Sequence, residues 1–201
     1  MRTIGLTGGI GSGKSSVSRW LTKHGIPVLD ADKIVHWLLA EDKKLIQELV
    51  AEFGEKVLTH EGCIDRKMLG SLIFGDERRR VFLEKAVHPR VLEILLQERR
   101  TLAEQGCKLC VWDIPLLFEA GMEGYVDEVW VVWTEESAQL LRVSERDKLP
   151  VEDIEKRILA QMPLADKRMR ADRVIDNSGQ WEGTEKQLER LTMEFILTQE
   201  G

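Results

Sequence analysis

The chain has 201 residues, of which 43% are hydrophobic and 32% charged, and its formal net charge is −6. Such a length suffices for one α/β domain with insertions or for a core with a small second domain. The acidic balance argues against a general nucleic-acid-binding protein, and no apolar run approaches the roughly 18 residues that span a membrane. The sequence opens directly into a predicted strand, so we expect no signal peptide. We expect a cytoplasmic protein without nucleic-acid or membrane partners, as a monomer or weak homo-oligomer.

The first predicted strand, residues 2–7, leads into the most informative motif of the chain. Residues 8–15 read G-G-I-G-S-G-K-S, which matches the phosphate-binding loop pattern G-x-x-x-x-G-K-[ST] in full. Glycines let successive backbone N–H groups turn toward a phosphate, and a helix predicted from Ser16 to about Lys23 points its positive end at the same place. A glycine-rich turn without a ligand is the alternative, and the complete strand–loop–helix context disfavours it. The loop therefore predicts binding of a nucleoside triphosphate.

Individual residues of this loop have separate expected roles. Lys14 is expected to reach the β- and γ-phosphates and to act in catalysis, and the Ser15 hydroxyl is suited to Mg²⁺. The residues expected to contact the nucleotide are Gly8, Gly9, Gly11, Ser12, Gly13, Lys14, Ser15 and Ser16.

Strands and helices alternate along the rest of the chain, which predicts an α/β fold with a five-stranded parallel sheet flanked by helices. Further strands are expected at 26–29, 109–113, 128–133 and 174–175, and a helix at the C-terminal end. Three parts are expected: a nucleotide-binding core at 1–30, 106–134 and 171–201, a helical insertion at 31–105, and a helical lid at 135–170.

Acidic residues follow the second and third predicted strands, where open parallel sheets bind their ligands. Asp30 and Asp32 lie in the sequence D-A-D after the second strand, and Asp113 closes the third. A carboxylate after the third strand suits Mg²⁺ beside Ser15, and one after the second suits a base for an acceptor hydroxyl. Because aspartate is also a favoured helix cap, capping fits Asp30 as well as catalysis does. For Asp32 and Asp113 we predict functional roles.

The charged segment 135–170 is expected to be helical and to bring arginines to a reacting phosphate. Arg142 and Arg146 are four residues apart and therefore share a helix face. A solvated charged helix is the ordinary explanation, but a phosphoryl-transfer enzyme also needs a mobile lid that carries arginine. We predict catalytic roles for Arg142 and Arg146, whereas both explanations fit Arg157 equally well.

The three cysteines, Cys63, Cys107 and Cys110, give no disulfide framework. Cys107 and Cys110 form a lone C-x-x-C at the entry to a predicted buried strand, without a second pair or a nearby histidine. We therefore expect them to pack as small hydrophobic residues.

A series of short motifs runs in order from about residue 4 to residue 179. Besides the loop, they are D-A-D-x-x-x-H at 30–36, I-D-R at 64–66, H-P at 88–89, D-I-P-L-L-F-E at 113–119, R-x-x-x-R-D at 142–147, Gln161, A-D at 171–172 and I-D-N-S-G at 175–179. Together they resemble the dephospho-coenzyme A kinase family over nearly the whole chain. The loop alone is shared by many ATPases, whereas D-I-P-L-L-F-E with D-A-D and I-D-N-S-G is far more specific. The resemblance implies a P-loop kinase that uses ATP and Mg²⁺ to phosphorylate the ribose 3′-hydroxyl of dephospho-coenzyme A.

The resemblance also implies roles for the helical insertion, which is expected to bind the acceptor. His36, Arg66 and His88 are expected to contact the adenosine and pyrophosphate of that acceptor, with Arg66 pairing with a phosphate. His88 precedes Pro89 and could equally start a helix, with its ring in a hydrogen bond.

In the core, the resemblance implies two further contacts with substrate. Leu116, Phe118 and Glu119 are expected to form a wall of the acceptor site. Asn177 is expected to read the adenine edge of ATP, although asparagine before Ser-Gly is also an ordinary turn residue.

Two rival functions share some of these features. A GTP-dependent switch requires the sequence N-K-x-D, but Ser178 follows Asn177, so that motif is absent. A nucleoside-monophosphate or other small-molecule kinase would share the loop, lid and cleft carboxylates. The D-A-D and D-I-P-L-L-F-E motifs argue against that rival.

Overall fold

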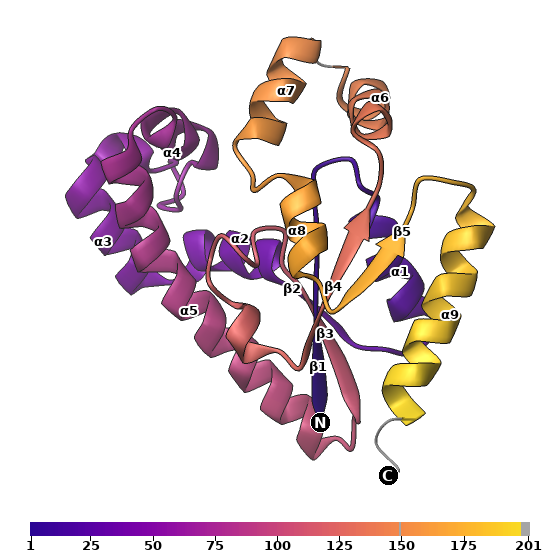
Figure 1. Ribbon diagram of the computed structural model, residues 1–201. Helices are drawn as coiled ribbons and strands as arrows, with labels where there is room; N and C mark the ends of the chain where they lie inside the picture. Colours follow the sequence, from indigo (N-terminus) through magenta and orange to yellow (C-terminus); the bar gives the residue numbers. More distant parts are fainter. Residues whose placement is uncertain (149, 198–201) are drawn as a thin grey trace. The chain divides into compact units, whose positions relative to one another are not determined.

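The computed structural model describes residues 1–148 and 150–197 (Figure 1). The chain divides into two compact units. The sheet unit comprises Met1–Leu29 and the described residues from Leu102 onward, and the helical unit comprises Asp30–Thr101. Within the described part of the chain, no helix is both long and apolar enough to cross a membrane.

Five strands form a single sheet: β1 (Arg2–Gly8), β2 (Val28–Asp30), β3 (Leu109–Asp113), β4 (Glu128–Trp133) and β5 (Arg173–Asp176). Their order is β2-β3-β1-β4-β5, with β1 parallel to both β3 and β4, and β4 parallel to β5. Because neighbouring parallel strands end at the same edge, Gly8 and Asp113 lie at one edge of the sheet. The prediction of a five-stranded parallel sheet flanked by helices is confirmed.

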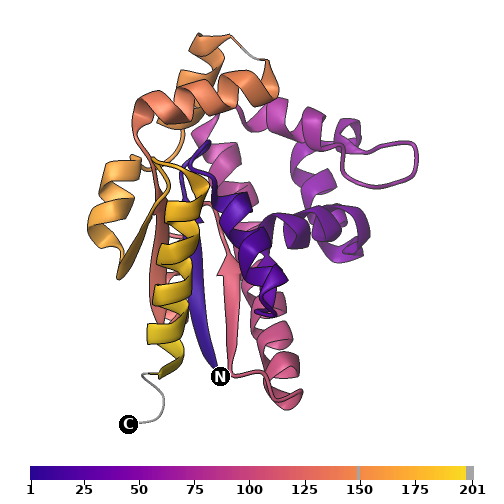
Figure 2. The same ribbon diagram turned by 90° about the vertical axis from the view of Figure 1, so that its right-hand side faces the viewer.

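One face of the sheet packs against helices α1 (Lys14–Lys23) and α9 (Trp181–Leu197), which lie on the near side of the strands in Figure 2. Alternate residues of each strand point to this face, so Ile4 and Leu6 of β1 and Trp130 of β4 are fully buried in one cluster with residues of both helices. This packing fixes the start of α1, and with it the loop that precedes the helix.

The remaining helices of the sheet unit are η2 (Glu123–Tyr125), α6 (Glu136–Asp147), α7 (Val151–Leu159) and α8 (Leu164–Arg170). Contacts therefore group the predicted lid segment, 135–170, with the sheet unit.

The helical unit contains α2 (Ala31–Glu41), α3 (Lys43–Phe53), η1 (Glu55–Val57), α4 (Arg66–Ile73) and most of α5 (Glu77–Glu104). Aspartates cap three of these helices. Asp30, Asp42 and Asp65 each accept hydrogen bonds from the first-turn N–H groups of α2, α3 and α4. The caps fix where each helix begins.

Some element boundaries differ from those predicted. Helix α1 begins at Lys14 rather than Ser16, because Gly13 takes φ +91° and serves as its N-cap. Strand β2 begins at Val28, since the Ile26 N–H bonds back to Leu21 and so still belongs to the turn that ends α1.

The prediction that His88 could start a helix is wrong. His88 and Pro89 lie inside α5, a helix of 28 residues. Proline inside a helix removes one backbone hydrogen bond. The helix continues because Val87 and Val91, on either side of Pro89, are buried by packing.

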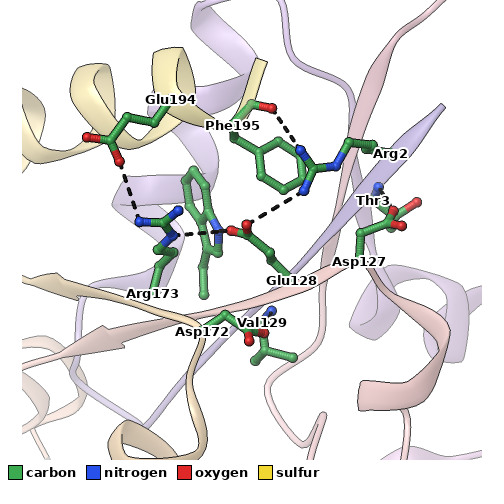
Figure 3. Close-up of polar contacts among 10 residues, drawn as sticks. Arg2, Thr3, Asp127, Glu128, Val129, Asp172, Arg173, Glu194 and Phe195 are labelled. Atoms are coloured by element: carbon green, nitrogen blue, oxygen red, sulfur yellow. Dashed lines mark hydrogen bonds and ion pairs between the residues drawn. The ribbon is translucent and has the colours of Figure 1, made fainter. Parts of the chain in front are cut away.

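Aspartates just before β4 and β5 fasten the amino ends of the strands (Figure 3). The Thr3 N–H donates to Oδ2 of Asp127 at 2.6 Å, and the Asp127 N–H donates to the Thr3 carbonyl at 2.9 Å. Asp172 makes the same two contacts with Val129, at 2.7 and 2.9 Å. The A-D motif at 171–172 thus has a structural role at the edge opposite the P-loop.

Glu128 joins two arginines at this same edge. One carboxylate oxygen lies 3.6 Å from Nη2 of Arg2, and the other lies 3.5 Å from Nε of Arg173. The second oxygen also accepts a hydrogen bond from the indole N–H of Trp130 at 3.0 Å. Glu128 therefore ties β1 and β5 to the strand between them.

Candidate active site

The P-loop, residues 8–15, connects β1 to α1. The Ser12 N–H donates to the Gly9 carbonyl at 3.1 Å, which closes a tight turn, and the Ser16 N–H donates to Gly13 at 2.9 Å. The first N–H groups of a helix have no intrahelical acceptor and carry the positive end of its dipole. The N–H groups of Lys14 and Ser15 therefore form a binding site for an anion at the carboxyl edge of the sheet.

Lys14, Asp113 and Ser18 form a cluster where this loop enters α1. The Lys14 ammonium pairs with Oδ1 of Asp113, and the Ser18 hydroxyl donates to Oδ2 at 2.5 Å. Side-chain exposure is 15% for Lys14 and 8% for Asp113, so water screens the pair little. The sequence predictions for Lys14 and Asp113 thus converge on one site, because β3 lies next to β1.

The residues beside this cluster fit a magnesium ion. Mg²⁺ takes oxygen ligands and keeps several of its waters. The Ser15 hydroxyl is exposed at the start of α1, and the Asp113 carboxylate already accepts from Lys14 and Ser18. These surroundings suit Ser15 and Asp113 as the residues that would hold Mg²⁺.

Asn177 supports the P-loop from the end of β5. Its side-chain N–H group donates to the Ser12 carbonyl at 2.7 Å, and its oxygen accepts from the Thr184 hydroxyl at 3.0 Å. A Cβ atom at Gly13 would collide with this amide, so the close approach requires glycine there. Asn177 is 7% exposed and its amide is engaged inside the protein. The predicted contact with adenine stays a prediction.

Arg142, on α6, lies beside the same strand end. Its guanidinium donates to the Asn177 carbonyl at 2.8 Å and to the Thr134 hydroxyl at 3.5 Å. The predicted catalytic arginine is therefore anchored next to the P-loop residue Gly13, whose added Cβ would lie 4.0 Å from Nη1 of Arg142.

Arg146, the other predicted catalytic arginine, pairs with its neighbour Asp147. Two parallel contacts join them, Nε to Oδ1 at 2.6 Å and Nη2 to Oδ2 at 2.9 Å. Hydrogen bonding to Arg146 lowers the pKa of the Asp147 carboxyl. Arg157, for which the sequence left both explanations open, lies 3.5 Å from the same carboxylate, so Asp147 holds both arginines.

The D-I-P-L-L-F-E motif has mainly buried side chains. Leu116 is 42% exposed, whereas Phe118 is 6% exposed and lies under the guanidinium of Arg170, 4.3 Å from the ring centroid. Of these two predicted wall residues, Leu116 alone presents a surface to a ligand. A direct substrate contact is not supported for Phe118 because the residue is buried.

Glu119, the third predicted wall residue, forms an ion pair with Lys167. The two charged groups are 2.9 Å apart, and the same Glu119 oxygen accepts from the Met162 N–H at 2.9 Å. Lys167 is fully buried and also donates to the Pro115 carbonyl at 2.8 Å. Burial lowers the pKa of the Lys167 ammonium, and the bond to Glu119 opposes that shift. The pair fastens the motif to α8.

The two aspartates of D-A-D have different surroundings at the start of α2. Asp30 accepts a hydrogen bond from the Lys33 N–H at 3.1 Å and lies 3.6 Å from the Lys33 ammonium, so it caps α2. Asp32 is exposed in the first turn of that helix. Capping, one of the two roles open for Asp30, is thus observed.

His36 and Arg66 come together within the helical unit. Nη1 of Arg66 lies 3.5 Å from Nδ1 of His36, although the two residues are 30 positions apart. The I-D-R motif explains the placement. Ile64 is buried and bonds to Leu39 through its backbone, Asp65 caps α4, and Arg66 is the first residue of that helix.

His88, the third histidine-or-arginine residue predicted to bind the acceptor, lies on α5. Burial lowers the pKa of its imidazole, and the negative charge of Glu84 opposes this shift.

Sequence reasoning missed Ser18, Gln139 and Lys167. Ser18 lies four residues after Lys14, a spacing that places both on one face of α1 and could have revealed it. Gln139 shares the buried face of α6 with Val143, and a polar residue in an apolar stripe is a usable signal. Lys167 lies among exposed charges of α8, and no signal in the sequence distinguishes it.

The structure has the features of a P-loop kinase. These are a parallel sheet, a complete P-loop with a lysine–aspartate pair beside it, and the arginines of α6. The family model for dephospho-CoA kinase matches residues 2–183. The dephospho-CoA kinase of Shouchella clausii is 45% identical over 92% of this chain and 94% of its own length. That of Arabidopsis thaliana is 41% identical over 97% of this chain and 84% of its own. The chain belongs to the dephospho-CoA kinase family, whose members use ATP as co-substrate.

Solved structures agree with this family. The dephospho-CoA kinase of Campylobacter jejuni is 28% identical and superposes with a TM-score of 0.73, covering 97% of this chain and 98% of its own. A Thermus thermophilus protein gives 38% identity and a TM-score of 0.83 over 96% of this chain and 97% of its own. Shikimate kinase from Acinetobacter baumannii, at 18% identity and a TM-score of 0.55 over 100% of this chain and 95% of its own, shares the fold.

Proposed function

We propose that the chain transfers the γ-phosphate of ATP to the ribose 3′-hydroxyl of dephospho-coenzyme A, giving coenzyme A and ADP. The bond from the γ-phosphorus to the β,γ-bridging oxygen breaks, a bond to the 3′-oxygen forms, and the hydroxyl proton passes to a base. The observation that carries the proposal is the Lys14–Asp113 pair below a complete P-loop in a member of this family.

On the nucleotide side, positive charge stabilises the transferring phosphoryl group. Lys14 supplies an ammonium group, and the N–H groups at the start of α1 supply fixed dipoles. Asp113, itself held by Ser18, limits where the ammonium can lie. Ser15 and Asp113 would hold Mg²⁺, which would supply positive charge to offset that of the phosphates.

Arginines of the 135–170 segment are proposed to complete the charge around the phosphates. Arg142 is anchored beside Gly13 and suits a fixed contact with the nucleotide. Arg146 and Arg157 share the carboxylate of Asp147, so each would exchange a protein partner for a phosphate.

For the acceptor, Asp32 is proposed to orient the 3′-hydroxyl and to take its proton. The assignment rests on chain order, because Asp32 follows the last residue of β2 by two positions, and on the use of Asp30 as a helix cap. His36 and Arg66 are proposed to bind an acceptor phosphate together, since a guanidinium beside an imidazole offers several N–H donors to one anion. Leu116 is proposed as an apolar wall of the acceptor site.

A panel of acceptors tests the proposed reaction. The purified chain is incubated with ATP, Mg²⁺ and, separately, dephospho-coenzyme A, AMP, CMP or shikimate, and ADP release is measured. Release with dephospho-coenzyme A should exceed that with each other acceptor by at least about a hundredfold, the discrimination expected from several hydrogen bonds to a correct substrate. Equal or faster turnover of a nucleoside monophosphate or shikimate would overturn the proposal.

A further inference from the structure

Two glutamine side chains from the 135–170 segment hold the P-loop at Ile10. Oε1 of Gln161 accepts a hydrogen bond from the Ile10 N–H at 3.1 Å. Nε2 of Gln139 donates to the Ile10 carbonyl at 2.8 Å. Both polar groups of one loop residue are therefore bonded to side chains more than 120 residues away in the sequence.

Helix α6 lies so close to the P-loop that it leaves little room for side chains on Gly9 and Gly11. A Cβ atom on Gly9 would lie 2.6 Å from Nε2 of Gln139. A Cβ atom on Gly11 would lie 2.8 Å from the Gln139 carbonyl and 2.9 Å from Val143. Gln139 is 4% exposed. Helix α6 thus packs directly on the loop. This packing requires glycine at position 11, whereas a side chain at position 9 would displace the Gln139 amide.

The bond from Gln139 fixes the direction of the next peptide group. A trans peptide is planar, with its C=O and N–H pointing to opposite sides. When Gln139 holds the Ile10 carbonyl, the Gly11 N–H of the same peptide points away from Gln139. Rotation of that peptide would replace a donor by a carbonyl oxygen, which repels a phosphate. Phosphate binding by such a loop depends on the direction of its N–H groups.

We propose that Gln139 and Gln161 are positioning residues that keep the P-loop peptides around Ile10 in their phosphate-binding orientation and link the loop to α6 and to the residues after α7. Neither glutamine is assigned a contact with the reacting atoms. The kinetic test of this inference rests on the proposed kinase activity. The test by ADP binding needs no acceptor and does not depend on that activity.

The two glutamines have opposite hydrogen-bonding roles, because an N–H group can only donate and a carbonyl can only accept. Gln161→Glu keeps an oxygen that accepts from the Ile10 N–H. Gln139→Glu puts a carboxylate oxygen against the Ile10 carbonyl and loses the bond. Each variant adds one negative charge beside the same loop residue, and only Gln161→Glu keeps the hydrogen bond. Because Gln139 is the more buried of the two, an uncharged pair of variants is needed as well.

The experiment measures ADP affinity by calorimetry, steady-state kinetics and thermal unfolding for the full chain. Gln139→Glu should weaken ADP binding and raise KM for ATP by about tenfold or more relative to Gln161→Glu, the size of effect expected for one lost hydrogen bond with an unpaired carbonyl left behind. KM for the acceptor should change by less than about twofold in both variants. A general loss of structure would change the acceptor KM as well.

The near-isosteric variants Gln139→Met and Gln161→Met are a second pair, which keeps the test valid if Gln139→Glu does not fold. Both should weaken ADP binding, because methionine neither donates to the carbonyl nor accepts well from the N–H. Equal ADP affinities of the two glutamate variants, or unchanged affinity in both methionine variants, would overturn the inference. If the unmodified chain binds ADP but does not phosphorylate dephospho-coenzyme A, the proposed function is contradicted. The ADP-binding test of the two glutamines remains valid in that case.

Discussion

The Lys14 ammonium and the Asp113 carboxylate are paired at the carboxyl edge of the sheet, where β3 ends and α1 begins. The pair joins the residue that closes one strand to the first helical residue after the neighbouring strand. Ser18, one helical turn beyond Lys14, donates to the other oxygen of the carboxylate. The direction of the lysine side chain is therefore set by two adjacent elements of the fold, and the same contacts lead to the first two predictions.

Lys14→Ala should lower kcat by at least about a hundredfold, because it removes charge that stabilises the transferring phosphoryl group. The fold should remain, since α1 is held by the buried Val17 and Leu21. Lys23→Ala, an exposed lysine at the other end of α1, is the matched control and should be near wild type. If Lys14→Ala retains more than about a tenth of wild-type kcat, the role given to Lys14 is incorrect.

Asp113→Asn should raise the Mg²⁺ concentration needed for half-maximal activity, because an amide is a weaker ligand than a carboxylate and no longer balances the Lys14 charge. Excess Mg²⁺ should restore part of the activity. Asp127→Asn, which makes the same change at the opposite edge of the sheet, should leave the Mg²⁺ titration unchanged. Superimposable titrations of Asp113→Asn and wild type would remove Asp113 from the metal site.

Asp32→Asn should lower kcat by about a hundred- to ten-thousandfold, the usual contribution of a general base, with ATP affinity nearly unchanged. Asp30→Asn is the control, because asparagine is also a good N-cap and should preserve both helix α2 and turnover. A loss of ATP affinity in Asp32→Asn would move that residue to the nucleotide site. A larger kcat loss in Asp30→Asn would make Asp30 the base.

The parallel sheet and the convergence of Lys14 with Asp113 were predictable from sequence. Local patterns mark each strand, and parallel strands bring residues at their carboxyl ends to a common edge. The P-loop motif has the same backbone requirement wherever it occurs. These are rules of chain geometry, so a single sequence reveals them.

Other features depend on packing between distant segments and could not be predicted in this way. The H-P motif suggests a helix start, but burial of the residues around Pro89 keeps α5 continuous. The sequence around Asn177 suggests a turn or an adenine contact, and gives no sign that its amide donates to the Ser12 carbonyl. Nothing in the sequence indicates that Phe118, a predicted wall residue of the acceptor site, packs beneath the guanidinium of Arg170. In each case the contact is made with a residue distant in the sequence, which the local sequence does not specify.

Glu128→Gln should destabilise the sheet without changing turnover, because the residue bridges Arg2 and Arg173 at the edge opposite the P-loop. The expected loss is about 1 kcal/mol, or roughly 3 °C in Tm for a chain of this size. Glu189→Gln, an exposed glutamate on α9, is the control and should change Tm by less than about 1 °C. An unchanged Tm for Glu128→Gln, or a large loss of kcat, would contradict the structural role assigned to Glu128.

The position of the new phosphate tests the central claim most directly. The purified chain is given ATP, Mg²⁺ and dephospho-coenzyme A, and the product is analysed by phosphorus NMR with proton coupling, beside a reaction with Lys14→Ala. The account predicts a new phosphomonoester resonance coupled to the ribose 3′-proton, formed in step with ADP and strongly reduced in the variant. A phosphate on any other atom, or an equal yield with Lys14→Ala, would contradict it.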